Sequence, residues 1–160
     1  MKNFKNWIKF LGVYQIAGGI VGIILIAYDF VFIAEIPTNE YYLSPLALVL
    51  FGFSIYSGNL LLALKYSEGL KFSLINQIIQ TIGFSIAGIM YVFGSGVFLS
   101  IGLDLTDDLM VEFLLWTSNI EIGVLGDKSQ LMVSFNVVAI YLVFRVLNLR
   151  KQHAFLSPRL

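Results

Sequence analysis

The sequence contains no cysteine, which excludes disulfide bonds, thiolate nucleophiles and thiolate metal sites. Its single histidine, His153, lies close to the end of the chain, so we expect no histidine-based metal centre or catalytic triad. Phosphate-binding glycine loops, zinc-protease motifs and nucleophile elbows are also missing from the sequence. We therefore predict no catalytic residue, no metal site and no cofactor.

Charged residues are scarce. They make up 12% of the 160 residues, whereas 58% are hydrophobic, and the mean hydropathy is +0.85. A soluble domain has about 25% charged residues. Because so little charge cannot cover a water-soluble fold, the composition predicts an integral membrane protein. The net charge is zero, so no overall electric field favours nucleic acid as a partner.

Four apolar stretches, almost free of charge, are each long enough for a membrane-spanning helix. They lie at about residues 8–33, 45–64, 72–95 and 131–149. About 20 apolar residues are needed to cross the hydrocarbon core of a bilayer. The sequence therefore predicts an all-α membrane protein, an antiparallel bundle of four transmembrane helices that forms a single domain over residues 1–160.

The two signs of charge fall on opposite sides of these helices. All basic residues except Lys128 lie before or at the start of the first helix, between the second and third, or at and after the end of the fourth. All acidic residues except Glu68 lie in the other segments or next to them. Basic residues concentrate on the cytoplasmic side of membrane proteins. We therefore expect both termini to lie in the cytoplasm and the protein to lie in a cytoplasmic or inner membrane.

Residues 96–130 form the one long segment between predicted helices, and its periodicity differs. Residues 101–105 and 120–124 alternate between large apolar residues and glycine or polar residues. This period of two is typical of strands, with turns expected at 106–108 and 126–127. We predict a small extracytoplasmic β-ribbon between the third and fourth helices.

Uncharged amide side chains from three predicted helices fall at similar depth in the membrane. They are Gln15, Asn59, Asn76, Gln77 and Gln80. An amide that faces hydrocarbon without a partner costs several kcal/mol, so these groups should face one another or water. Hydrogen bonding between helices is the simplest interpretation. The alternatives are a polar pocket open to the cytoplasm and an ion pathway.

Two further features predict contacts. Gly12, Gly19 and Gly22 form a stripe on the first helix, where small residues let helix backbones approach closely. This stripe predicts packing within the bundle, or else a seam between copies or a pore wall. Arg145 lies near the end of the fourth helix, where it can reach the lipid headgroups or bind an anionic headgroup or a partner's carboxylate.

These patterns indicate three broad classes of function. The first hypothesis is a non-enzymatic structural or accessory membrane component that presents its extracytoplasmic segment to a partner. That partner would be another membrane protein or a second copy, within the lipid bilayer. The alternative is a small oligomeric channel or transporter subunit with the amide layer along its pathway. An intramembrane enzyme acting on lipid is a third hypothesis, for which no acid–base pair is evident.

Overall fold

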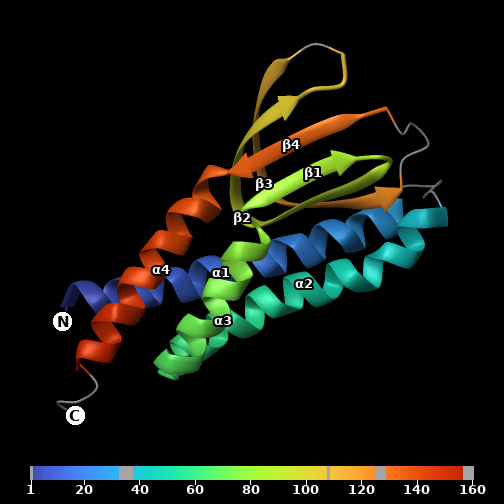
Figure 1. Cartoon of the computed structure of the whole chain (residues 1–160). Coiled ribbons are helices and arrows are strands. Elements are labelled where there is room, and N and C mark those ends of the chain that lie inside the picture. The colour runs from blue at the N-terminus through green and yellow to red at the C-terminus, as the bar shows by residue number, and fades with distance from the viewer. Residues whose placement is uncertain (1, 33–37, 108, 125–128, 157–160) are drawn as a thin grey trace.

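The computed structural model describes residues 2–32, 38–107, 109–124 and 129–156, which form four helices and a four-stranded antiparallel sheet (Figure 1). In chain order these are α1 (Lys2–Phe32), α2 (Thr38–Leu62), α3 (Tyr66–Ile79), β1 (Ile82–Ile86), β2 (Ile89–Asp104), β3 (Met110–Val124), β4 (Leu131–Asn136) and α4 (Val137–Leu156). The prediction of an all-α four-helix bundle was therefore wrong.

α1 and α2 form an antiparallel hairpin and are the two helices long and apolar enough to cross a membrane among the described residues. The candidate span in α1 covers 30 residues and contains an 18-residue window with a mean hydropathy of 2.1, and that in α2 covers 19 residues and contains a window with 1.7. Both helices begin several residues before the predicted starts at 8 and 45. As a result, Pro45 lies inside α2 rather than in its first turn.

The third predicted helix, 72–95, is wrong beyond its first third. α3 ends at Ile79 and β1 begins at Ile82. The reason is local, because the large apolar residues of 82–86 alternate with Gly83 and Ser85, which is a strand pattern. Ala87 and Gly88 then have φ values of 54° and 82° and connect β1 to β2, as in a tight type I′ hairpin.

The fourth predicted helix, 131–149, is wrong in its first turns. Residues 131–136 form β4, and α4 begins only at Val137. The Asn136 side chain accepts hydrogen bonds from the backbone N–H groups of Val138 and Ala139, at 3.1 and 3.2 Å. Asn136 therefore caps the helix N-terminus, where a short polar side chain satisfies donors that lack a helical partner.

The strands predicted at 101–105 and 120–124 belong to β2 and β3, apart from Leu105, and these two strands pair along their length. The sheet order is β1-β4-β2-β3, and β1 also pairs with the beginning of β2. β2 bends strongly, so its beginning pairs with β1 and its end pairs with β4. Because β1 and β4 also pair with each other, the three strands form a closed circuit. Asp108 and the predicted turn at 126–127 lie outside the described residues.

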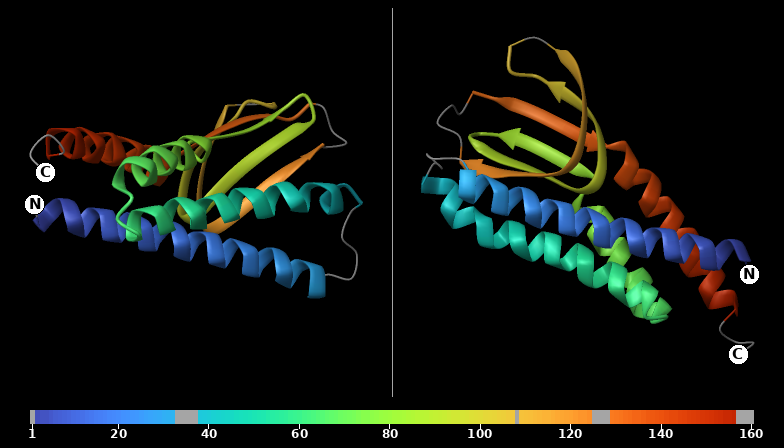
Figure 2. Two further views of the ribbon diagram at one scale, coloured as in Figure 1. Left: turned by 90° about the horizontal axis from the view of Figure 1, so that it is seen from below. Right: turned by 180° about the vertical axis from the view of Figure 1, so that it is seen from behind.

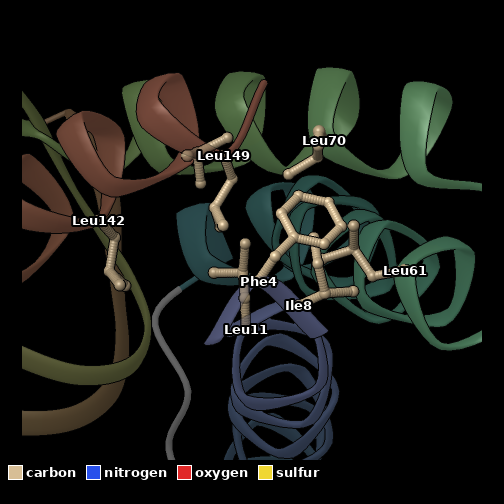
Figure 3. Close-up of a cluster of buried hydrophobic side chains, with 8 residues drawn as sticks. Phe4, Ile8, Leu11, Leu61, Leu70, Leu142 and Leu149 are labelled. Atoms are coloured by element: carbon tan, nitrogen blue, oxygen red, sulfur yellow. The ribbon is translucent and has the colours of Figure 1, made fainter. Parts of the chain in front are cut away.

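The helices and the sheet divide the molecule along its length. The sheet lies beside the second half of α1 and the first half of α2, whereas α3 and α4 lie beside the other halves (Figures 1 and 2). An apolar core joins the four helices there (Figure 3), formed by Phe4, Ile8, Leu11, Leu61, Leu70, Leu142, Val146 and Leu149. We call this half the helical half and the other the sheet half.

Glycine brings α1 and α2 into close contact. A Cβ atom on Gly12 would lie 3.1 Å from the backbone oxygen of Gly58, and one on Gly19 would lie 2.7 Å from the backbone oxygen of Phe51. A Cβ on Gly22 would overlap the Phe51 ring. The predicted stripe of Gly12, Gly19 and Gly22 thus faces α2 within the same chain.

We expect Gly19→Ala to destabilise the protein, because the added methyl group would push α1 away from the backbone of α2. Overpacking of this kind costs about 1–3 kcal/mol. Gly52→Ala is the matched control, since no atom lies within 4 Å of a Cβ at that position. Thermal unfolding in mild detergent should show a lower midpoint for Gly19→Ala only. Equal midpoints would contradict the close contact.

Candidate functional site

Buried polar side chains from three helices meet where the helical half joins the sheet half. Ser73 on α3 donates a hydrogen bond to Oε1 of Gln15 on α1, at 3.3 Å. Ser54 on α2 donates one to Oδ1 of Asn76 on α3, at 2.9 Å. All four side chains are fully buried. Gln15 and Asn76 are thus each bonded to a serine hydroxyl group rather than to each other.

Gln80 extends this group into the sheet. Its Nε2 donates to the backbone oxygen of Asn76 at 3.1 Å, and its Oε1 accepts from the backbone N–H of Ser95 on β2 at 2.8 Å. Gln80 follows the last residue of α3, so its side chain connects the end of a helix to a strand. We call Gln15, Ser54, Ser73, Asn76, Gln77, Gln80 and Ser95 the polar cluster.

Several polar atoms of this cluster have no hydrogen-bond partner among the described residues. They are Nε2 of Gln15, Nδ2 of Asn76, both side-chain polar atoms of Gln77, and Oγ of Ser95. A buried polar group left unpaired costs about 1–3 kcal/mol. Because the cluster contains no charged side chain, the groups that suit it are water or a small neutral polar molecule.

Asn59 does not belong to the polar cluster, which corrects the sequence-based grouping. It is exposed, whereas Ser54 and Ser57 are buried on the same helix. Asn59 lies five residues after Ser54, which places it about 140° around an α-helix from that residue. Its side chain therefore points away from α3. Ser54 and Ser57 lie nearly one helical turn apart within an apolar stretch, and this spacing could have indicated that both side chains share one buried face.

A second polar contact joins α1 to the bend of β2, and sequence reasoning missed it. Ser95 and Gly96 together oppose Ser118 on β3, forming a β-bulge, and Gly96 has a φ of 99°. Ser118 Oγ accepts from the Gly96 N–H at 2.9 Å and donates to the backbone oxygen of Gly18 on α1 at 2.8 Å. Tyr14 donates to the Val97 oxygen at 3.0 Å.

Glycine is required at both sides of this contact. A Cβ on Gly18 would overlap the backbone of Gly96, and a Cβ on Gly96 would lie 2.6 Å from the Tyr14 ring. The positive φ of Gly96 is also rarely adopted by other residues. α1 and β2 therefore touch backbone to backbone at this point.

Arg145 lies in a basic cavity between the beginning of α1 and α4. Its guanidinium group stacks over the Trp7 ring, 4.1 Å from the ring centre. The cavity has a volume of about 530 Å³, and Lys151 also lines it, with no acidic residue among the described lining residues. Among the described residues, Arg145 Nε is buried without a hydrogen-bond partner. The positive charge of the site suits an anionic group, and binding of a headgroup by Arg145 stays a prediction.

A larger cavity of about 700 Å³ lies in the sheet half, between α1 and β3. Its lining runs from Gly22 to Asp29 on α1 and from Leu115 to Ile120 on β3, and it is mostly apolar. Asp29 is the only charged residue there among those described. The mostly apolar lining of this cavity suits an apolar chain.

The turn after β2 carries a separate acidic group. Hydrogen bonds from the Thr106 side chain and backbone lower the pKa of Asp104, which is partly exposed. The Thr106 hydroxyl group also accepts from the Leu131 N–H at 3.1 Å. Asp104 therefore stays ionised and helps to order the turn.

Comparison with known proteins adds no assignment to these sites. The sequence matches no protein-family model and no curated protein, and the structure matches no solved structure.

Gln77 and Gln80 give a matched pair of variants for the polar cluster. Gln80→Leu leaves the Ser95 N–H without its acceptor, which should lower the free energy of unfolding by about 1–3 kcal/mol. Gln77→Leu removes two unpaired polar atoms and keeps a similar volume, so stability should stay the same or rise. Denaturation in detergent measures both. A loss for Gln77→Leu as large as that for Gln80→Leu would contradict this pattern of hydrogen bonds.

Proposed function

We propose that the protein is an integral membrane component of a cytoplasmic or inner membrane, with both termini on the cytoplasmic side. α1 and α2 are long and apolar enough to span a bilayer. Lys5 and Lys9 near the start of α1 and Lys151 near the end of α4 lie at one end of the molecule, whereas Asp29 lies near the other end of α1. The positive-inside bias supports a cytoplasmic position for the basic end.

Within that membrane the protein acts as a non-enzymatic accessory component that presents the β2–β3 hairpin to a partner. The observation that carries this proposal is the hairpin itself, whose outer end rises away from the helices (Figure 1). Leu109 and Met110 at this end are 68% and 55% exposed. Exposed apolar residues on a projecting segment are typical of contact surfaces. The partner is another membrane protein or a second copy of this chain.

A membrane-impermeant, thiol-reactive photo-crosslinker tests both parts, because the chain has no native cysteine. Leu109→Cys should react in intact cells and, on illumination, form a discrete cross-linked product. Ser67→Cys is the control: this position is exposed and lies in the first turn of α3, near the basic end. It should react only after the cells are opened. Labelling of Ser67→Cys in intact cells would overturn the topology, and labelling of Leu109→Cys without a product would overturn the partner.

A channel or transporter subunit is the second candidate, and the unpaired polar atoms of Gln77 favour it. In the same labelling experiment, Gln77→Cys distinguishes the two candidates. A water-filled pathway would allow a small hydrophilic thiol reagent to react with it in opened cells. A packed cluster, which we expect, would leave it unreactive in the folded protein.

A further inference from the structure

The sheet has its apolar face on the outside. Across the four strands, one row of paired residues on the outer face consists of Ile82, Phe135, Ile101 and Phe113. The next row runs from Phe84 on β1 to Val111 on β3 and is also apolar throughout. Phe113 is 70% exposed. In water, this face would be the one that the fold buries.

The inner face has the opposite character. The row between those two consists of Gly83 on β1, Ser134 on β4, Gly102 on β2 and Glu112 on β3. A Cβ on Gly83 would lie 2.5 Å from Ser134 Oγ, so the curled sheet has room only for small side chains there. Apolar residues outside and small or polar residues inside are the pattern of β-strands that face lipid.

The depth of the sheet follows from its contact with α1. Lys9 and Asp29 are 20 residues apart, which corresponds to about 30 Å along a helix and to the thickness of the hydrocarbon core. Gly18, which touches the backbone of Gly96, lies near the middle of this stretch. If α1 spans the bilayer, the bend of β2 is therefore near the bilayer centre.

The lengths of the elements agree with this depth. α3 has 14 residues and β1 has 5, which correspond to about 21 Å and about 17 Å, so that together they can cross the hydrocarbon core of about 30 Å. β4 and α4, with 6 and 20 residues, can do the same in the reverse direction. In both pairs the helix lies in the helical half and the strand in the sheet half (Figures 1 and 2).

The geometry points to two composite crossings, α3–β1 and β4–α4, in which the sheet lies within the outer half of the bilayer and lipid acyl chains cover its outer face. The circuit of pairings among β1, β4 and β2 satisfies backbone groups that lipid cannot. On β3, the other edge strand, residues 115–120 line the cavity between this strand and α1. This inference rests on the membrane position proposed for α1 and α2, and it extends that position to the sheet.

Quenching of tryptophan fluorescence by phospholipids with brominated acyl chains tests the inference on the full chain. Trp7→Phe and Trp116→Phe remove the two native tryptophans. Phe113→Trp then reports on the outer face of the sheet. Val49→Trp is the matched control, because it lies on the spanning helix α2 and is 66% exposed. Asp107→Trp reports on the exposed turn beyond β2.

In phosphatidylcholine vesicles we expect Phe113→Trp and Val49→Trp to lose a similar, large fraction of their emission, and Asp107→Trp to lose much less. Quenching of Val49→Trp without quenching of Phe113→Trp would overturn the composite crossings and leave the membrane position of α2 intact. Water or a second copy would then cover the sheet. Absence of quenching at both positions would overturn the membrane position as well. Ile101→Trp, which pairs with Phe113 in the same outer row, repeats the test if Phe113→Trp does not fold.

Discussion

The backbone contact between Gly18 on α1 and Gly96 on β2 is the constraint on which the rest of the structure depends. It places the bend of the longest strand against the middle of the longest helix. Ser118 bridges the two backbones through its hydroxyl group, and Gln80 fixes the neighbouring Ser95 N–H to the end of α3. These contacts hold the middle of α1, the bend of β2 and the end of α3 next to one another. At this point the chain changes from helical to extended structure.

This change explains why the polar cluster lies where it does. A helix that ends inside an apolar environment leaves backbone groups without helical partners, and side chains near the end must satisfy them. The Tyr91 hydroxyl group donates to the Ile79 oxygen at the end of α3, and the Asn136 N–H donates to the Thr81 oxygen. Asn136 also caps α4. Part of the buried polarity thus serves the two helix–strand junctions, whereas the Ser73–Gln15 and Ser54–Asn76 hydrogen bonds join helices. Among the described contacts, neither role explains the Gln77 side chain.

The sequence allowed α1, α2 and part of the β2–β3 ribbon to be predicted, because each depends on local composition or period. The helix–strand junctions at 80–82 and 136–137 were missed because the prediction of spanning helices relied on the length of uncharged runs. It did not take into account the spacing of large apolar residues within each run. The period was present in the sequence: residues 82–86 and 131–136 alternate between large apolar residues and mostly small or polar ones. Gln15, Asn76 and Gln80 could be grouped by depth, whereas the partners Ser73, Ser54 and Ser95 depend on how the helices and the sheet pack.

Amide hydrogen exchange of the protein in lipid nanodiscs tests the central contact most directly. The N–H groups of Ser95 and Gly96 lie at the bulge of β2 and donate to the side chains of Gln80 and Ser118. If α1 and β2 touch as described, these two amides should exchange as slowly as those in the middle of α1. Exchange of Ser95 and Gly96 as fast as that of Asp107 in the exposed turn would contradict the account.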